Sequence, residues 1–373
     1  DEDVHSAVER RLYELAGDVA GKLHTGRSRN DQICLDLRLY LRRQAEARAV
    51  QITDMIRVLA NLAEGVGDTV VASYTHLQQA QAVPLAHHFL AYAWMLLRDR
   101  DRFQDACSRI DVSPLGAGAS AGSRLPLDPS HTAEALGFKD VFANSMDAVG
   151  SRDFVAEYAF CCAQTMVTLS RLAEEMILWA SDEYGWVTYS DSFTTGSSAM
   201  PQKKNPDVAE LTRGRTATVI GDLTALMTLQ KGLPLTYNRD LQEDKRAVFH
   251  ADDSVSLALA ALGGMLESAT FHPPEPSSMI TALDLAEVLV KRGVPFRDAH
   301  GVVGGLVAEL VAEDRTLGDA TAGELAGAHS QLVPSDLEAL TPAGSVADRA
   351  TAGGGSMASV RAQLAKLRGV LEE

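Results

Sequence analysis

The sequence predicts an all-α fold in which long helices form a central bundle, and three observations support this prediction. Long stretches contain neither Gly nor Pro, and apolar residues recur along them with the period of a helix. Uninterrupted stretches of this kind favour long helices over strands. Polar residues instead gather in the gaps. The stretches are residues 27–64, 85–112, 151–184 and 236–262, and the polar gaps are residues 24–31, 73–84, 113–126, 191–206 and 234–245.

The first long stretch shows the helical period most clearly. Its apolar residues recur at intervals of three and four residues, which places them on one face of a helix. A helix over the whole stretch would be roughly 55 Å long at about 1.5 Å per residue, and only a bundle of similar helices buries such a face. The residues of this stripe are Ile52, Met55, Ile56, Leu59, Leu62 and Ala63.

Proline-rich residues 273–276 form the clearest linker in the chain. After them the sequence becomes rich in Ala, Gly and Glu, and its apolar runs become shorter, so we place a domain boundary there. We therefore expect three parts. Residues 1–26 are the remainder of an N-terminal helical domain, residues 27–275 are the central bundle, and residues 276–373 are a small C-terminal helical domain.

The composition excludes several classes of protein. Of 373 residues, 34 are Lys or Arg and 50 are Asp or Glu, and the formal charge of −16 argues against a nucleic-acid partner. No run approaches the roughly 18 apolar residues of a membrane span, and no signal peptide is visible, so we expect a cytoplasmic protein without a membrane partner. Because no His, Cys, Asp or Glu set has the spacing of metal ligands, we expect no metal, and we expect no cofactor.

Two smaller features have mainly structural interpretations. The cysteines lack Cys-x-x-Cys spacing, and we interpret Cys34, Cys107, Cys161 and Cys162 as buried free thiols. Glycine-rich residues 116–122 are not a phosphate-binding loop, because no Gly-Lys-Ser/Thr follows them. Two interpretations of this segment stay open: a tight turn or a close approach of helices, or a loop whose backbone faces a ligand.

Residues 196–206 form the most informative segment of the chain. They read Gly-Ser-Ser-Ala-Met-Pro-Gln-Lys-Lys-Asn-Pro, and they place hydroxyls, ammoniums and an amide between residues that interrupt regular structure. Chemistry commonly lies on a loop that a rigid scaffold positions, and this loop suits an anion. Residues 207–211 then begin a helix, with acidic side chains in the first turn, where the helix dipole favours them.

This segment resembles the mobile catalytic loop of the fumarase/aspartase superfamily, whose members share the pattern Gly-Ser-Ser-x-Met-Pro-x-Lys-x-Asn-Pro. The match is complete over that pattern. The resemblance implies a fumarase/aspartase-like fold, and it extends over essentially the whole chain from Glu2. Family members carry a further N-terminal segment before the position of Asp1. Smaller departures are Ser73, where Gly is usual, and Ala82, where Pro is usual.

A second polar cluster precedes the first long helix. Ser28, Arg29 and Asn30 follow Arg27, and paired guanidiniums suit carboxylates, which accept two hydrogen bonds from a planar fork. The alternative is a helix cap with surface ion pairs, and charge content alone favours it. The sequence of residues 22–32, however, resembles that of the argininosuccinate lyase branch of the superfamily. This resemblance implies that these residues bind substrate.

A histidine lies in a third polar segment, residues 74–81. His76 is flanked by Thr75 and, two residues on, Gln78. A histidine can donate or accept a proton near neutral pH, although an isolated one is more often structural. The family motif Thr-His-x-Gln reverses that preference and implies a catalytic residue.

Two further segments resemble the same branch. Residues 144–154 look like the family segment that ends in an arginine directed to the active site, which makes Arg152 a candidate. On charge alone, residues 237–245 are merely the start of a charged helix. The resemblance implies that they contact the substrate through Tyr237, Gln242 and Lys245.

The resemblance also implies a reaction. Family members remove a proton beside a carboxylate of a substituted succinate and expel the substituent by anti elimination, through an aci-carboxylate intermediate. Argininosuccinate would give arginine and fumarate, as a step of arginine biosynthesis. Preorganised donors aimed at the charge that develops on the intermediate lower the barrier most.

The roles follow from the motifs. We expect Ser197 to be the general base, with Ser198 as the second candidate, because adjacent hydroxyls on a mobile loop cannot be ranked from sequence. Lys203 and Asn205 would stabilise the intermediate. A serine is a poor base in water, so the loop must exclude water and stabilise the alkoxide.

The remaining roles concern the leaving group and the substrate carboxylates. His76 would serve as, or orient, the general acid, with Glu210 as its partner, and Arg29, Asn30 and Thr75 would hold carboxylates. In this superfamily the site combines motifs from three protomers, which implies a homotetramer whose active sites are shared by three subunits.

Two alternatives are kept. The first is another N-substituted aspartate lyase of the same superfamily, acting on adenylosuccinate or an aminocarboxylate, and the release of fumarate from a panel of substrates would distinguish it. The second is a catalytically silent structural homologue, which an intact tetramer that releases no fumarate would indicate. The pattern of residues 27–30 and 237–245 favours argininosuccinate.

Overall fold

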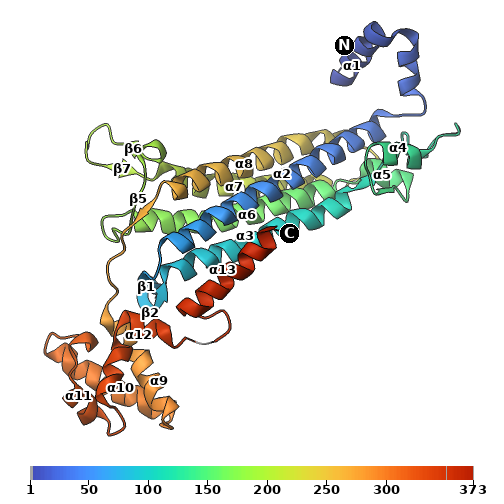
Figure 1. Cartoon of the computed structure of the whole chain (residues 1–373). Coiled ribbons are helices and arrows are strands. Elements are labelled where there is room, and N and C mark those ends of the chain that lie inside the picture. Colours follow the sequence, from blue (N-terminus) through green and yellow to red (C-terminus); the bar gives the residue numbers. More distant parts are fainter. Residues whose placement is uncertain (1–2, 350, 373) are drawn as a thin grey trace. The chain divides into compact units, whose positions relative to one another are not determined.

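The computed structural model describes residues 3–349 and 351–372, and it confirms the all-α fold (Figure 1). Glu2, where the family resemblance begins, lies outside the described residues. Most of each stretch without Gly or Pro forms one long helix. The long helices are α2 (Arg29–Gly65), α3 (Leu85–Ile110), α6 (Asp153–Trp179), α7 (Asp207–Gln230) and α8 (Asp244–Glu267).

The apolar stripe predicted on α2 is buried. Ile52, Ile56 and Leu59 have no exposed surface, and Met55 and Ala63 are almost as buried. Leu62, at the edge of the stripe, is half-buried. The hydrophobic contacts of this face therefore hold α2 in place, as the period of the sequence predicts.

Helix α8 differs from the prediction at both ends. It begins at Asp244 after the short 3₁₀ helix η3 (Arg239–Glu243), and it continues past Leu262 through two glycines to Glu267. Glycine weakens a helix, but packing decides here: a Cβ on Gly264 would lie 2.6 Å from the Phe193 ring. The close approach of the Phe193 ring, rather than helix propensity, explains why a glycine lies within the helix at this position.

Contacts between Cα atoms divide the chain into two units, and every long helix contributes to both. Unit 1 consists of Asp1–Ile52, Arg98–Arg171 and Leu211–Ala260. Unit 2 consists of Thr53–Leu97, Leu172–Glu210 and Ala261–Glu373. The three-domain division expected from composition is a different partition and stays a prediction.

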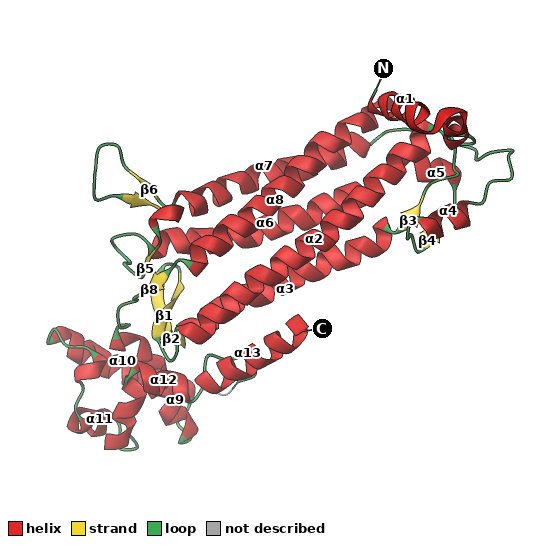
Figure 2. Ribbon diagram, turned by 45° about the horizontal axis from the view of Figure 1, so that its top comes forward, coloured by secondary structure: helices red, strands yellow, loops and turns green. Residues whose placement is uncertain are grey.

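Within unit 1, segments of the long helices lie side by side (Figures 1 and 2). A polar group lies in the apolar core between them. Asp252 accepts hydrogen bonds from Tyr158 and, at 3.3 Å, from Tyr40, and its Oδ1 lies 3.6 Å from Arg48 Nε. Asp252 and Tyr158 are almost completely buried. Such a network fixes the register of α2, α6 and α8, because any shift would leave buried polar groups without partners.

The smaller elements of unit 1 lie before and between the long helices. The chain begins with α1 (Val4–Ala16) and the 3₁₀ helix η1 (Gly17–His24). Between α3 and α6 lie β3 (Val112–Ser113), α4 (Pro129–Ala135), β4 (Asp140–Val141) and α5 (Ser145–Gly150), and β3 pairs with β4 in parallel. Asp128 and Asn144 cap α4 and α5, as Asx side chains do at helix N-termini.

Unit 2 contains the short antiparallel strand pairs, which the prediction of helices and polar gaps did not anticipate (Figure 2). Residues 73–84, read as a polar gap, belong mostly to a hairpin. The pairs are β1 (Val70–Thr75) with β2 (Gln78–Pro84), β5 (Val187–Thr188) with β8 (Thr270–Phe271), and β6 (Thr195–Gly196) with β7 (Lys204–Asn205).

The C-terminal part of unit 2 has a hydrophobic core of its own. Buried leucines of α9 and α10, together with Leu317, Leu325 and Leu340, form its centre. The helices are α9 (Ala282–Lys291), α10 (Phe296–Ala312), α11 (Ala322–Ala328), α12 (Pro342–Ala347) and α13 (Met357–Glu372), and the short 3₁₀ segments of unit 2 are η2 (Asp191–Phe193), η4 (Ser278–Thr281), η5 (Leu317–Asp319) and η6 (Pro334–Leu340).

Two general expectations can be compared with the described residues. Cys34, Cys161 and Cys162 are buried free thiols, as predicted, while Cys107 is free and half-buried. Among the helices of the described part of the chain, none combines the length and the apolar character needed to cross a membrane.

Candidate active site

His76 lies at the tip of the β1–β2 hairpin, in an unusual turn. Thr75 pairs with Gln78, so His76 and Leu77 are the two residues of the turn, and both have positive φ, 55° and 57°. Two-residue hairpin turns favour this left-handed backbone, but Asn and Gly normally supply it. All four side chains are exposed. The turn therefore holds the imidazole out in solvent at an energetic cost, as functional sites often do.

Ser197 and Lys203 mark the two ends of the signature loop. Gly196 of β6 pairs with Lys204 of β7, so residues 197–203 form a loop closed by that pair. The Ser197 hydroxyl oxygen accepts hydrogen bonds from the amides of Ala199, at 3.2 Å, and Met200, at 3.1 Å. Amide donors of this kind stabilise negative charge on the oxygen, which an alkoxide requires.

The base of this loop is tied to its surroundings by charged side chains. Thr195 donates a hydrogen bond to Asp207, the first residue of α7, and Lys204 forms an ion pair with Asp191. Ser198 and Lys203 are exposed, and Asn205 is half-buried at the end of β7. These contacts hold β6 and β7 in place, while the residues of the loop stay accessible to a ligand.

Glu210 lies in the first turn of α7, where the helix dipole favours a carboxylate. Its side chain is exposed. No hydrogen bond or ion pair joins His76 to Ser197, Lys203 or Glu210 in the described part of the chain. One chain thus presents these groups on two separate hairpins and a helix N-terminus.

The start of α2 is organised by Asp31, which the sequence reasoning overlooked. Its carboxylate has no exposed surface and accepts hydrogen bonds from the amides of Ser28, at 2.8 Å, Gly118, at 2.9 Å, and Gly116, at 3.2 Å. Asn30 Nδ2 donates to Ala119 O at 3.1 Å. The glycine-rich loop is therefore fastened to the beginning of α2. An acid three residues after a serine at a helix start is the available sequence signal.

The glycines of that loop are required by its geometry. Gly116 and Gly118 have φ values of 103° and 63°, and a Cβ on Gly118 would lie 2.9 Å from the carbonyl oxygen of Gly122. The first of the two open interpretations, a tight turn, describes this segment. Its amides face a buried carboxylate of the protein.

Arg29 extends from the same helix start toward carboxylates of the N-terminal segment. Its Nε lies 3.6 Å from Asp3 Oδ2, and its Nη2 lies 3.7 Å from Glu9 Oε2. Oε1 of Glu9 also lies 2.9 Å from Nδ1 of His24, and this hydrogen bond lowers the pKa of Glu9. The guanidinium is half-buried and attracts carboxylates, as the prediction of a carboxylate site requires.

Arg152, Asp244 and Lys245 form a second buried cluster of unit 1. Asp244 has no exposed surface, and its two oxygens accept hydrogen bonds from Arg152 Nε and from Lys245 Nζ, each at 2.6 Å. Arg152 is itself 1% exposed. Lys245 is half-buried, so its ammonium reaches the surface of the unit.

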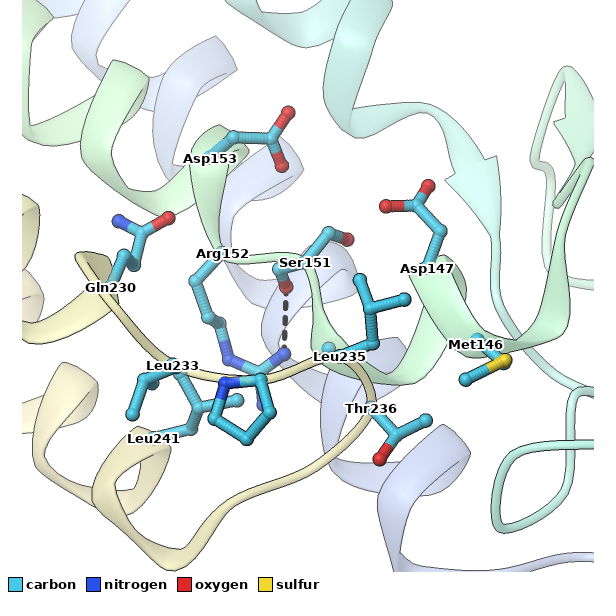
Figure 3. A pocket seen from close by; sticks show the side chains of 12 residues that line it. Met146, Asp147, Ser151, Arg152, Asp153, Gln230, Leu233, Leu235, Thr236 and Leu241 are labelled. Carbon is cyan, nitrogen blue, oxygen red and sulfur yellow. Dashed lines mark hydrogen bonds between the residues drawn. The ribbon is translucent and has the colours of Figure 1, made fainter.

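A cavity of 240 Å³ lies beside this cluster (Figure 3). Arg152 lies on its wall and donates through Nη1 to the Ser151 carbonyl at 2.8 Å, the bond drawn as a dashed line in Figure 3. Residues 233–236 form the opposite wall, just before the half-buried Tyr237. A Cβ on Gly150 would lie 2.6 Å from the Thr236 carbonyl oxygen, so glycine permits the close approach of these segments.

The predicted site residues thus fall into two groups, each described within its own unit. Unit 1 holds residues predicted to bind substrate, and unit 2 holds the predicted catalytic residues together with further residues predicted to bind substrate. The first group comprises Ser28, Arg29, Asn30, Arg152, Tyr237, Gln242 and Lys245, and the second comprises Thr75, His76, Gln78, Ser197, Ser198, Lys203, Asn205 and Glu210. Among the described residues, no group of three or more His, Cys, Asp and Glu side chains is arranged to hold a metal ion.

Comparisons with known proteins place this chain in a family. Residues 1–221 match the family model described as Lyase, and residues 279–347 match the model described as Argininosuccinate lyase C-terminal. Argininosuccinate lyase of Cutibacterium acnes is 50% identical over 374 residues, which cover 99% of this chain and 80% of that protein. The chain belongs to the argininosuccinate lyase family. The corresponding protein of Frankia casuarinae is 49% identical, over 100% of this chain and 81% of that protein.

Solved structures share the fold of this chain. An EDDS lyase in complex with formate has a TM-score of 0.87 and is 30% identical, over 98% of this chain and 76% of that chain. A class II fumarase from Schistosoma mansoni has a TM-score of 0.71 at 16% identity, over 85% of this chain and 70% of that chain, and it shares the fold. The prediction of the fumarase/aspartase superfamily is confirmed.

Proposed function

We propose that this member of the argininosuccinate lyase family cleaves argininosuccinate to arginine and fumarate by anti elimination, as a step of arginine biosynthesis. One observation supports this most strongly. The complete signature loop, residues 196–206, closes as a hairpin loop with Ser197 and Lys203 at its ends, in a chain about half identical to relatives of that name.

Ser197 takes the proton from the carbon beside the substrate carboxylate. The amides of Ala199 and Met200 already point at its oxygen, and Lys203 supplies a positive charge at the other end of the same loop. Closure of the loop over substrate would remove water and strengthen these interactions. Lys203 and Asn205 then stabilise the aci-carboxylate intermediate, and Ser198 remains the second candidate for the base.

His76 delivers, or orients, the proton that the departing guanidino nitrogen needs, and Glu210 is its partner. The hairpin turn holds the imidazole in solvent, and Glu210 lies exposed in the first turn of α7. Because His76 has no hydrogen-bond or ion-pair partner among the described residues of one chain, contributions from neighbouring copies would complete the site.

The carboxylates of the substrate and its guanidino group need different contacts from the protein. Arg29 attracts carboxylates already within the chain, at Asp3 and Glu9, which supports a carboxylate site at the start of α2. The proposed substrate-binding residues are Ser28, Arg29, Asn30, Thr75, Gln78, Arg152, Ser198, Asn205, Tyr237, Gln242 and Lys245.

The proposed assembly is a homotetramer whose active sites are each shared by three subunits. Helix α7 supports it, because large apolar side chains of this helix are exposed in the single chain: Leu211 is 61% and Met227 is 62% exposed. Ile220 of the same helix, and Phe249 and Leu257 of α8, are also exposed. Apolar surface of this extent on long helices is typical of a face that packs against another subunit.

The domain division and the cellular location belong to the same proposal. The matches of residues 1–221 and 279–347 to separate family models support a domain boundary near residues 273–276. A cytoplasmic location is supported by free cysteines, since reducing conditions keep thiols unpaired.

The reaction is tested by supplying argininosuccinate, adenylosuccinate and N-carboxyalkyl aspartates separately to the purified protein. Release of fumarate, and of arginine in equal amount, from argininosuccinate alone is the expected result. Fumarate from another member of the panel would assign the first alternative. Absence of fumarate from every compound, with an intact tetramer, would assign the silent structural role.

A further inference from the structure

Asp244 joins two cations that differ in their access to solvent. Arg152 Nε and Lys245 Nζ each lie 2.6 Å from one of its oxygens. The side chains of Arg152 and Asp244 are 1% and 0% exposed, whereas that of Lys245 is 32% exposed. The buried carboxylate therefore has a buried cation on one side and an accessible cation on the other.

Two of the three guanidinium nitrogens of Arg152 donate hydrogen bonds within the protein. Nε donates to Asp244 and Nη1 donates to the carbonyl of Ser151, while Nη2 is buried without a partner. A buried ion pair depends on good hydrogen-bond geometry between its two partners. Loss of one partner leaves the charge of the other uncompensated. Asp244 is also the first residue of α8, where the helix dipole adds to its stabilisation.

The cluster carries one negative and two positive charges. With Arg152 present, one positive charge remains uncompensated, and it resides on the accessible ammonium of Lys245. Without Arg152, Asp244 would neutralise Lys245 and leave the cluster with no net charge. An anionic ligand would then meet a weaker field at the same ammonium.

We infer that Arg152 is a positioning residue that compensates the charge of Asp244, so that Lys245 remains free to attract a substrate carboxylate. The inference rests on the proposed function of Lys245 as a substrate contact. It replaces the direct substrate contact proposed above for Arg152 by an indirect part in binding.

The test is a double-mutant cycle in the full protein. Arg152→Met should raise KM for argininosuccinate about tenfold and the inhibition constant of succinate in parallel, with a smaller change in kcat. Addition of Asp244→Asn should bring KM back to within about threefold of wild type, because the carboxylate that offsets the charge of Lys245 is then removed. Arg152→Lys, which preserves the compensating charge, should keep KM near the wild-type value.

Stability is measured on the same proteins by thermal unfolding. Arg152→Met removes one of the two partners of buried Asp244, and Asp244→Asn leaves the buried guanidinium of Arg152 unpaired. Each should therefore lower Tm, and the double variant should recover part of the loss. If Arg152→Met does not fold, Asp244→Asn alone decides. The inference predicts no rise in KM for it, whereas direct contact of Arg152 with substrate predicts a rise, since Arg152 would lose its anchor.

Lys245→Met separates the inference from the function on which it rests. An unchanged KM in that variant would overturn the role of Lys245 and the inference together. A raised KM in Lys245→Met, with no rescue of Arg152→Met by Asp244→Asn, would overturn the inference alone and leave the proposed function standing.

Discussion

Ser197 and Lys203 lie at opposite ends of one loop whose base is closed by the pairing of Gly196 with Lys204. A hydroxyl and an ammonium that are distant along the loop are thereby held next to the same strand pair. The amides of Ala199 and Met200 complete the surroundings of the Ser197 oxygen. One small hairpin therefore carries both the proposed base and a cation to stabilise the charge that it creates.

His76→Asn tests the proposed role of the imidazole without disturbing the turn. Asn is among the side chains that best tolerate a positive φ, so the hairpin should keep its structure. We expect kcat to fall by about 10²–10⁴-fold, the usual contribution of a general acid, with Tm unchanged.

Leu77→Gly is the matched control in the same turn. Glycine adopts the φ of 57° without strain, so the variant should keep its activity and gain up to about 1 kcal/mol in stability. Equal losses of activity in both variants would show that turnover depends on the shape of the turn, and not on the imidazole.

Asp31→Asn should loosen the glycine-rich loop. The amide group that replaces one carboxylate oxygen faces N–H donors, so at least one buried hydrogen bond is lost, at a cost of about 1–3 kcal/mol in the free energy of unfolding. Denaturant unfolding measures it. Asp54→Asn, an exposed position later on the same helix, is the control and should change stability little, because its surface ion pair with Arg57 is screened by solvent. Similar stabilities for both variants would contradict the role of Asp31.

Acid should weaken the C-terminal part of unit 2 through Asp336. The guanidinium of Arg292, bonded to both carboxylate oxygens, holds the pKa of Asp336 below the usual 3.8. A lowered folded-state pKa contributes stability above the unfolded value, and that contribution is lost as pH falls through the folded value. Unfolding should therefore become easier below about pH 4.

Asp336→Asn removes the titrating group and should flatten that part of the pH profile, while it lowers stability at neutral pH. Asp348→Asn is the comparison, because its exposed pair with Lys291 is screened by solvent. A profile below pH 4 that is unchanged by Asp336→Asn would assign the acid response to other carboxylates.

Mixing two inactive variants tests the shared active sites. If Ser197 and His76 of one site come from different subunits, a mixed tetramer of Ser197→Ala and His76→Asn contains some sites without either substitution. Co-refolded mixtures should then recover part of the turnover, whereas each variant alone stays inactive. Light scattering should report a tetramer in every sample, and a mixture that stays inactive as a tetramer would contradict shared sites.

The sequence predicted the long helices well because their boundaries depend on local signals. Gly- and Pro-free stretches set α2, α3 and α6, and the burial of Ile52, Ile56 and Leu59 follows from their spacing. The hairpin at His76 was not anticipated, because His and Leu are unusual at positive φ and carry no turn signal. The two strands of this hairpin, β1 and β2, are recognised only from their pairing in the folded chain.

The site shows the same division between local and tertiary information. Motifs identified the residues that carry chemistry, such as Ser197 and Lys203. The residues that hold other candidate segments in place, Asp31 at the start of α2 and Asp244 beside Arg152 and Lys245, were overlooked, because each has a partner far away in the chain, 85 and 92 residues respectively. A capping pattern marks Asp31 only as the acid of a helix start. Bonds to distant donors leave no periodic pattern, and only the folded chain reveals them.

The central claim is that Ser197 starts an elimination that releases fumarate from argininosuccinate, and ultraviolet absorbance of fumarate measures it directly. The wild-type protein should release fumarate, and Ser197→Ala should lower kcat by about 10²–10⁴-fold while succinate binds with unchanged affinity. Near-normal turnover in Ser197→Ala would contradict the claim, as would a folded wild-type tetramer that releases no fumarate.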